Sequence, residues 1–323
     1  MNFRQRVVVY VNRPGQGGRP EVVVFRDPKH NNQLQCPAGG VEDGESLEEA
    51  ARREVAEEVG LELADTPRRI SASLWRYSAV DTWCIQHFFS VAAPADLPDR
   101  WNHVLQNERG RTGSTVHCGW LPAKRLDRLI GGLGNAGMLL VPPAGRLARD
   151  DVTIRDATRD DLPAIIDLRN HAIATGYAIY SEEPLAPDSM DAAMDAALAG
   201  EYPLIVAEVD GRFAGYAGLS QYNHRTGYRY TAENSVYVST DMHGRGVGGA
   251  LLDALLARAA DMGLRTILSR IDSAQNASLA LHLSRGFAPV GIIREAGYKF
   301  DSWRDVVYLQ KLLTSDDAAH AEG

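Results

Sequence analysis

The chain has 323 residues, of which 45% are hydrophobic and 24% charged; this is the composition of a globular protein at about twice a common single-domain length. No apolar run approaches the roughly 20 residues of a membrane span, and the apolar stretch near the N-terminus is too short for a signal peptide. Residues 1–141 hold 17 basic and 17 acidic side chains and the remainder 17 and 25, so the net charge of −8 belongs to the C-terminal part. Neither part is basic, so we expect neither a nucleic-acid polymer nor a membrane as partner.

The cysteine content indicates the compartment. Cys36, Cys84 and Cys118 are odd in number and do not have the spacing of metal ligands. A reduced, cytoplasmic protein with ordinary buried thiols is therefore expected.

The first part of the chain is expected to combine several strands with one long helix. The strands are indicated by β-branched runs, and the helix by a run of strong helix formers that ends at Gly60. Residues 94–118 form a polar, glycine-containing stretch for which no element is predicted. Strands are expected at 6–11, 21–25, 71–79 and 82–93, and helices at 47–59 and 125–130.

The pattern of elements ends at residues 131–151, which are rich in glycine, proline and small side chains and are typical of an interdomain linker. The sequence predicts a first domain at 1–141, a linker at 142–151 and a second domain at 152–323. In the second domain, a helix is expected to begin near Thr158. Strands are expected at 152–158, 204–209, 213–220, 233–239, 266–272, 287–294 and 305–312, and further helices at 248–263 and 277–284.

Residues 39–61 place carboxylates at a spacing that suits a divalent cation. On a helix, Glu54, Glu57 and Glu58 stand at i, i+3 and i+4 and share one face. Like charges at this spacing repel each other, and a bound Mg²⁺ or Mn²⁺, which prefers oxygen ligands, would offset that repulsion. A solvated acidic helix face is the alternative.

The same segment resembles the Nudix box, and it matches that pattern at every defining position outside the carboxylate face as well, namely Gly39, Glu45, Arg53, Gly60 and Leu61. The resemblance implies an α/β/α sandwich that hydrolyses a nucleoside diphosphate linked to another moiety. A Nudix fold that binds its ligand without hydrolysing it is the alternative.

The resemblance also implies roles for individual residues. Glu54, Glu57 and Glu58 would be metal ligands, with Glu57 and Glu58 in the catalytic machinery. Glu45 would support the loop or a further metal ion, and Arg53 would orient a carboxylate. The metal ions would polarise the diphosphate and lower the pKa of bound water.

A glycine-rich turn at residues 244–249 follows a β-branched strand and precedes a helix rich in Ala and Leu. Backbone N–H groups at the start of a helix can bind a pyrophosphate. The turn comes after several strands of its domain, so it is not the first turn of a dinucleotide-binding unit. Its flanking elements make this signal stronger than a lone glycine-rich turn.

The second domain resembles the GNAT acetyltransferases. Gly246 and Gly248 match the Arg/Gln-x-x-Gly-x-Gly/Ala motif, whereas His243 departs from its first position. Within the superfamily, the sequence resembles phosphinothricin and methionine-sulfoximine acetyltransferases. That resemblance rests on YRYTAENSVYV (228–238), IDSAQNASLALHLSRGF (271–287) and GYKFDSWRDV (297–306). It implies a mixed-sheet α/β domain, so the whole chain is expected to be α/β (α+β), and acetyl-CoA as the acetyl donor.

The resemblance assigns the contacts with acetyl-CoA to three segments. The pantetheine arm would lie along a strand, the pyrophosphate on the glycine-rich turn, and a further contact would come from the position where the family usually has Asn. These segments are Val236, Tyr237 and Val238; Gly244, Arg245, Gly246, Val247, Gly248 and Gly249; and Gln275 with the adjacent Asn276.

The remaining candidates concern the acceptor and the transfer step. Glu233 matches the proposed general base, and His282 stands where many relatives have a Tyr that protonates the leaving thiolate. Arg225 and Arg229 could bind a substrate carboxylate bidentately. The alternatives are a strand-edge charge for Glu233, a packed helix residue for His282 and solvated side chains for both arginines.

The sequence therefore predicts a bifunctional enzyme. Its C-terminal domain would acetylate the α-amine of a small amino-acid-like compound, and its N-terminal domain would hydrolyse a nucleoside-diphosphate derivative with Mg²⁺. One rival is a single acetyltransferase regulated by a nucleotide-sensing Nudix module that does not hydrolyse its ligand, and another is a protein-lysine acetyltransferase. The acidic domain and the paired arginines favour a small acidic amine. Relatives of this kind are often dimers, which leaves a homodimer open by analogy.

Overall fold

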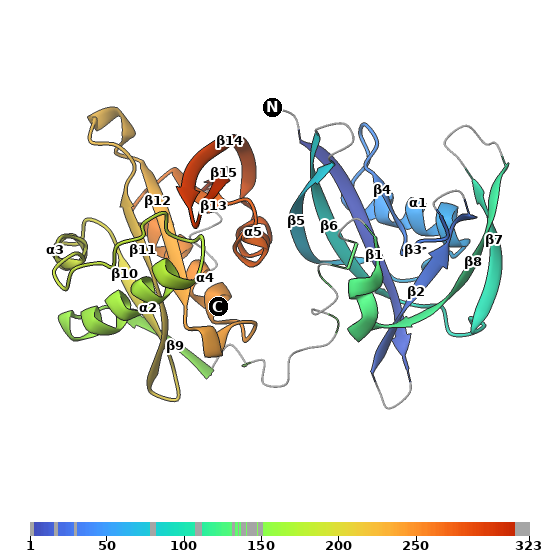
Figure 1. Cartoon of the computed structure of the whole chain (residues 1–323), viewed down its shortest axis with the longest axis horizontal. Helices are drawn as coiled ribbons and strands as arrows, with labels where there is room; N and C mark the ends of the chain where they lie inside the picture. Colours follow the sequence, from blue (N-terminus) through green and yellow to red (C-terminus); the bar gives the residue numbers. More distant parts are fainter. Residues whose placement is uncertain are drawn as a thin grey trace. The chain divides into compact units, whose positions relative to one another are not determined.

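The structure is a computed structural model that describes residues 3–15, 19–28, 31–77, 82–106, 112–130, 133–134, 136, 140, 147 and 151–313. The chain divides into two compact units, Asn2–Pro143 and Ala144–Gly323 (Figure 1). Apart from Leu147 and Asp151, the expected linker at 142–151 lies outside the described residues. No helix of the described ranges is long and apolar enough to cross a membrane.

The N-terminal unit is built on an eight-stranded mixed sheet in the order β5-β6-β1-β2-β8-β7, with β4 paired to β1 and β3 to β2. The first part of β1 pairs with β4 at residues 6–8, and its last part pairs with β2 at residues 12–14. On its other edge, β1 runs parallel to β6. The elements are β1 (Arg4–Pro14), β2 (Pro20–Arg26), β3 (Leu34–Gln35), β4 (Ala38–Gly40), α1 (Leu47–Val59), β5 (Arg68–Tyr77), β6 (Thr82–Ala92), β7 (Arg100–Gln106), β8 (Thr112–Pro122) and the 3-10 helix η4 (Ala123–Arg128).

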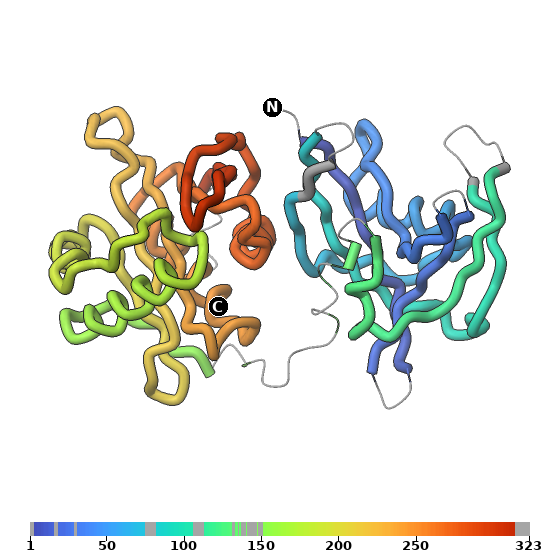
Figure 2. The backbone as a smooth tube through the Cα atoms, in the orientation of Figure 1, coloured from blue at the N-terminus to red at the C-terminus, as the bar shows by residue number. Residues whose placement is uncertain are grey.

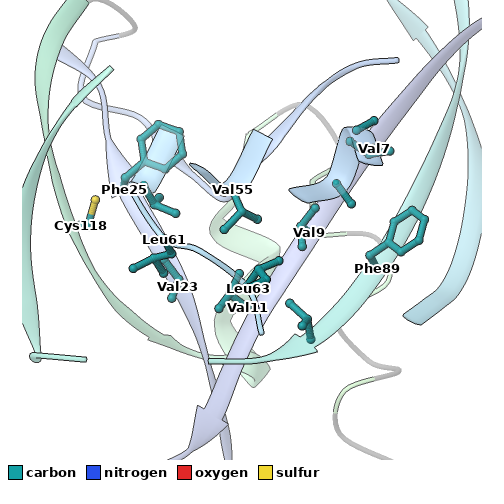
Figure 3. Packing of buried hydrophobic residues seen from close by; sticks show 14 of the residues in the cluster. Val7, Val9, Val11, Val23, Phe25, Val55, Leu61, Leu63, Phe89 and Cys118 are labelled. Atoms are coloured by element: carbon teal, nitrogen blue, oxygen red, sulfur yellow. The ribbon is translucent and has the colours of Figure 1, made fainter. Parts of the chain in front are cut away.

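The β-branched run in β1 is buried on both faces, so its alternating side chains enter two cores. Val7, Val9 and Val11 pack with α1 on one face (Figure 3). Val8 and Tyr10 pack on the other face with residues of η4 and the segment that follows it. The sheet is therefore covered by α1 on one face and by the 3-10 helix η4 with the segment that follows it on the other.

Strands β7 and β8 occupy most of the polar stretch at 94–118, for which the sequence predicts no element. Strand β7 is the edge of the sheet and β8 lies next to it, and only alternate side chains of β7 are covered. Trp101 and Leu105 pack against the core, whereas Asn102 and Val104 between them are exposed. The apolar signal is therefore too sparse to stand out from a loop.

The C-terminal unit is built on a seven-stranded sheet in the order β14-β15-β13-β12-β11-β10-β9 (Figure 2 traces its backbone). Strands β12 and β13 are parallel, and the other described neighbours are antiparallel. The strands are β9 (Val152–Asp156), β10 (Leu204–Val209), β11 (Arg212–Gln221), β12 (Thr231–Val238), β13 (Thr266–Asp272), β14 (Ala288–Lys299) and β15 (Ser302–Leu312). The helices are η7 (Arg159–Asp161), α2 (Leu162–Thr175), α3 (Asp191–Leu198), η8 (Thr226–Tyr228), η9 (Thr240–Met242), α4 (Val247–Asp261) and α5 (Asn276–Leu283).

Helices cover both faces of this sheet. Tyr216 of β11 packs with α2 and α3, in a core that includes Ile165 and Met194. The preceding residue, Gly215, lies against Leu251 of α4. Because neighbouring residues of a strand point to opposite faces, α4 covers the face opposite to α2 and α3.

Candidate active sites

Arg53 connects the glycine-rich loop of the N-terminal unit to helix α1. Its Nε and Nη2 donate to the two carboxylate oxygens of Glu45 at 2.8 and 3.0 Å, and Nη2 also donates to the Gly40 carbonyl at 2.7 Å. Its Nη1 donates to Glu54 Oε1 at 2.8 Å. One guanidinium thus fixes the carboxylate of Glu45, which precedes the helix, and that of Glu54, which lies on it.

The helix that carries these carboxylates has defined ends. Ser46 and Glu49 form a capping box, and Gly60 ends the helix in the left-handed conformation with φ of 72°. A Cβ on Gly39 would fall within 2.3 Å of the Glu54 carboxylate atoms, so a larger residue there would displace that side chain from its present position. Glycine at position 39 therefore lets the loop approach the helix closely, and glycine at position 60 permits the left-handed end of the helix.

Glu54 and Glu58 are carboxylates removed from water. Glu58 Oε2 accepts a hydrogen bond from the Ala38 N–H at 2.9 Å, yet burial raises the pKa of Glu58 to about 8. Burial also raises the pKa of Glu54, whose side chain is 9% exposed. The charge of Glu54 adds to the effect of burial on the pKa of Glu58, and the charge of Glu57 adds to it for both residues. A divalent cation with oxygen preference would stabilise such a pair, so the residues fit Mg²⁺ or Mn²⁺.

In this structure, the carboxylates of Glu54, Glu57 and Glu58 contact other groups of the protein. In the described ranges, no group of three His, Cys, Asp or Glu side chains is arranged to hold a metal ion. Glu54 is turned to Arg53 and Glu58 to Ala38, while Glu57 lies 3.4 Å from Arg53 Nη1. The three expected ligands share a helix face, but they would have to exchange these partners to coordinate an ion.

Arg6 on β1 is a site residue that the sequence does not single out. Against the larger effect of burial, its positive charge lowers the pKa of both Glu54 and Glu58. Its Nη2 donates to the Ala38 carbonyl at 3.3 Å, and its Nε is buried without a hydrogen-bond partner in the described structure. A lone arginine in a β-branched strand belongs to no motif, so only the pairing of β1 with β4 reveals its position.

In the C-terminal unit, strands β12 and β13 separate at one defined point. Their parallel pairing covers three register positions and ends at Glu233 opposite Leu268. Beyond this point β12 continues to Val238, paired in the described structure with β11 alone. The other edge of the Val236–Val238 segment is therefore open to hydrogen bonding with an extended ligand.

The glycine-rich turn leads from this edge into helix α4. Gly246 is the N-cap with φ of 101°, and no side chain caps the first turn. A Cβ on Gly246 would meet no atom within 4 Å, so the space beside the helix start is open. His243 bonds through Nε2 to the Val238 carbonyl at 2.9 Å, which joins the turn to the strand. The free first-turn N–H groups suit a pyrophosphate, so the segment fits acetyl-CoA.

Glu233 lies at the point of separation, and its partner is a residue that the sequence does not single out. Its carboxylate forms an ion pair with Arg270 of β13, and its side chain is 19% exposed. Arg270 thus holds the carboxylate at the end of the paired segment.

His282 is placed differently from the expectation of a proton donor. It is 4% exposed, and burial lowers its pKa to about 4. Nδ1 lies 2.8 Å from the Ser278 carbonyl and Nε2 lies 2.9 Å from Asn234 Nδ2, while the Ser269 hydroxyl donates to Asn234 Oδ1. This chain of contacts assigns the proton to Nδ1. Both ring nitrogens are occupied inside the protein, which disagrees with the predicted role of an acid for the thiolate.

The remaining predicted positions lie at the surface. Arg225 and Arg229 flank the exposed η8 segment and form no ion pair with any described residue; Arg229 stacks on Tyr230 at 4.5 Å. Gln275 is the half-buried N-cap of α5, and Asn276 is its exposed first residue. No contact in the described structure joins these four residues to Glu233.

The end of α2 and the segment after it are held by Lys299, a residue near the C-terminal end of the unit's sequence. Lys299 is fully buried, and its Nζ donates to the carbonyls of Ile173, Gly176 and Ile179 at 2.6 to 2.8 Å. Tyr180, next in that segment, donates to Asp272 Oδ2 at 2.7 Å. Asp272 in turn accepts two hydrogen bonds from Arg304.

Comparisons with known proteins assign each unit to a family. The NUDIX domain model matches residues 2–139, and the model of the acetyltransferase (GNAT) family matches residues 166–287. The chain therefore belongs to the GNAT acetyltransferases and carries an N-terminal Nudix domain, which confirms both family resemblances and the expected fold class.

Several characterised acetyltransferases are similar in sequence to the C-terminal unit. A phosphinothricin N-acetyltransferase of Alcaligenes faecalis is 39% identical, over 54% of this chain and 90% of the relative. An L-methionine sulfoximine/L-methionine sulfone acetyltransferase of Pseudomonas paraeruginosa is 38% identical, over 49% of this chain and 92% of the relative. A Sinorhizobium meliloti phosphinothricin acetyltransferase solved with AcCoA is 34% identical, over 50% of this chain and 89% of that one, with a TM-score of 0.49. The protein is a GNAT acetyltransferase related to these enzymes.

Proposed function

We propose that the C-terminal unit transfers an acetyl group from acetyl-CoA to the α-amine of a small amino-acid-like acceptor such as phosphinothricin or methionine sulfoximine. One observation carries the proposal: an open strand edge, a helix start without a side-chain cap and a carboxylate follow one another around the point where β12 and β13 separate. The acceptor class is supported by the names of the relatives.

The residues present would divide the work as follows. The open edge at Val236–Val238 would bind the pantetheine amides, and the amides of the 244–249 turn would bind the pyrophosphate. Glu233 would take a proton from the acceptor ammonium, and the neutral amine would attack the thioester carbonyl, whose C–S bond breaks to release the thiol group of CoA while the amide forms. Arg225 and Arg229 would bind the acceptor carboxylate.

We propose a second activity for the N-terminal unit, the hydrolysis of a nucleoside-diphosphate derivative. Glu54, Glu57 and Glu58 would hold Mg²⁺ or Mn²⁺, which would supply positive charge to the diphosphate and lower the pKa of bound water. Arg53 would keep the helix face aligned with the loop, and Arg6 would add positive charge beside the buried carboxylates. The burial of Glu54 and Glu58 beside each other supports this role.

A nucleotide-sensing Nudix module that regulates acetylation is the alternative. It is favoured by the present contacts of Glu54 and Glu58 with Arg53 and Ala38, which leave no ligand set ready in the described residues. The two proposals differ in one measurable respect, which is turnover of the nucleotide.

A substrate panel tests both activities on the full chain. With acetyl-CoA, phosphinothricin, methionine sulfoximine and methionine sulfone should be acetylated far faster than a lysine-containing peptide. With Mg²⁺, nucleoside-diphosphate sugars and dinucleoside polyphosphates should be cleaved at the diphosphate. Preference for the peptide would overturn the acceptor class, and tight nucleotide binding without cleavage would favour the regulatory module. The three buried free cysteines support a reducing, cytoplasmic setting for both reactions.

A further inference from the structure

The N-terminal unit has an open groove of about 1000 Å³ that the proposed functions do not use. It is lined by residues of the β1–β2 hairpin, β7, β8 and η4, with Leu34 at β3. None of its lining residues belongs to the Nudix-box segment at 39–61. The groove is therefore a separate feature from the carboxylate site.

The floor of the groove follows from the strand register. Val24 of β2, Gly119 of β8 and Arg100 of β7 stand directly opposite one another, so they share one face of the sheet. Gly119, the middle position, has no side chain to fill the space. A Cβ there would meet only the Asp99 carbonyl at 3.6 Å and Arg100 Cγ at 4.0 Å. Packing does not require glycine at this position, so the floor can be filled by mutation without strain.

The charges that line the groove are mostly positive. Four arginines contribute, whereas the two acidic residues, Glu21 and Asp99, both pair with Arg13 at 3.3 and 2.7 Å. Arg100 and Arg128 are exposed and form no ion pair with any described residue. The groove therefore has two uncompensated guanidinium groups, one on β7 and one on η4.

The lining also includes uncharged side chains. Val24, Leu34 and Leu121 contribute aliphatic surface, and His117, two residues before Gly119 on β8, contributes an imidazole. Arginine is the side chain best suited to phosphate, because its planar fork donates two parallel hydrogen bonds. The size and the positive charge of this open groove suit a small anionic molecule, and the unit carries no basic stripe for a nucleic-acid polymer.

We infer that this groove binds an organic phosphate, a small molecule with a phosphate for Arg100 and Arg128 and a flat or apolar part for the Val24–Leu121 surface. The site differs from the carboxylate site in needing no metal ion, because its recognition groups are cationic. Binding there does not depend on hydrolysis at the Nudix box.

Calorimetry on the full chain in metal-free buffer with a chelator tests the inference, with AMP as the probe. AMP should bind, and the double variant Arg100→Gln/Arg128→Gln should weaken binding at least about tenfold, since two charge-assisted contacts are lost. Gly119→Leu should weaken it similarly by filling the floor. Arg68→Gln is the matched control, because Arg68 is an exposed arginine on β5 at the opposite edge of the same sheet, and it should bind AMP as the wild type does.

Adenosine and inorganic phosphate, used as separate probes, measure how much each part of the ligand contributes to binding. Both should bind more weakly than AMP. Equal affinity for adenosine would overturn the role of the arginines, and equal affinity for phosphate would overturn the organic part. No binding of AMP, or unchanged binding in the double variant and in Gly119→Leu with circular dichroism like that of the wild type, would overturn the site itself. Hydrolysis measured separately with Mg²⁺ keeps this result independent of the proposed Nudix activity.

Discussion

The two candidate sites are built from different parts of the polypeptide. In the N-terminal unit the chemistry depends on side chains, with Glu54 and Glu58 buried beside each other and Arg53 holding the loop. In the C-terminal unit it depends largely on backbone, through the open edge of β12 and the uncapped start of α4. A side-chain site should fail when one residue changes. A backbone site should tolerate a different side chain, such as His243 at the first motif position, but not a group that obstructs the amides.

The largest expected effect is on the side-chain site. Glu58→Gln should abolish hydrolysis, with a loss of about 10³-fold or more, because a metal ligand that stabilises developing charge is removed. Glutamine can still accept the hydrogen bond of the Ala38 N–H, so the fold should persist. Diphosphate cleavage with Mg²⁺ is the measurement, and acetyl transfer should be unchanged. Glu48→Gln, an exposed change on the same helix, is the control; hydrolysis at the wild-type rate in Glu58→Gln would remove the residue from the mechanism.

Glu233 is the point at which the C-terminal site depends on a side chain. Glu233→Gln should lower kcat for acetylation by about 10²–10⁴-fold, because the acceptor ammonium loses its base. Binding of acetyl-CoA should barely change, since the turn at 244–249 is untouched. Steady-state kinetics from pH 6 to 9 measure the effect, with the exposed Glu201→Gln as control. A wild-type kcat across that range would exclude Glu233 as the base.

Obstruction of the backbone amides should weaken the binding of acetyl-CoA without altering Glu233, the proposed base. Gly246→Asp places a carboxylate where the pyrophosphate would approach, so affinity for acetyl-CoA should fall by about 10- to 100-fold. Gly246→Ala is the matched control, because it carries the cost of φ near 101° without the charge, and it should have the smaller effect. Calorimetry decides between the two. Equal affinity in Gly246→Asp and wild type would mean that the turn only begins the helix.

The two units also share a feature, a buried histidine. Burial lowers the pKa of His282, and likewise that of His87 on β6, to about 4. The unfolded chain takes up the proton near its ordinary pKa of about 6.5, so each histidine stabilises the fold above that pH and loses this contribution as pH falls from 6.5 towards 4. For His282 the loss should reach about 1–3 kcal/mol. Urea unfolding of the C-terminal unit at several pH values should show this loss, and His282→Gln should reduce the slope; an unchanged slope would contradict the assignment.

The smallest effect is expected from separating the units. Fragments 1–141 and 152–323 should each fold, because each has its own sheet and core. Hydrolysis by the first fragment and acetylation by the second should match the full chain within about twofold, as expected for independent domains. Circular dichroism and the two assays measure this, and an unfolded fragment would show that the units depend on each other.

Sequence reasoning succeeded where a site is local in the chain. The carboxylates, glycines and arginine of residues 39–61 lie on one loop and one helix, so their spacing alone predicts the shared face. Arg6 and Arg270 could not be found in this way, because strand pairing brings them to Glu58 and Glu233 from remote positions. The position of His282 followed from its motif, but its burial depends on packing between α5 and β12, which no local pattern records.

The same distinction applies to the fold. Strand β1 was predictable because both of its faces are buried and its side chains are continuously apolar. Strands β7 and β8 were not, since only alternate side chains are covered there, which leaves polar residues between Trp101 and Leu105. Helix α3 was also missed; only Met194 among its residues is fully covered, so its apolar pattern is weak.

The ammonium group of Lys299 has a consequence for the order of events during synthesis. Its three carbonyl acceptors lie 120 to 126 residues earlier in the chain, in the last turn of α2 and the segment that follows it. Contacts of such separation form late, because a long loop must close first. The nascent C-terminal unit therefore has to complete β14 before the Ile173–Ile179 segment can acquire its final conformation. We expect acetyltransferase competence to arise only after the last strands have left the ribosome, whereas the Nudix unit, synthesised first, can fold while the rest of the chain is still being made.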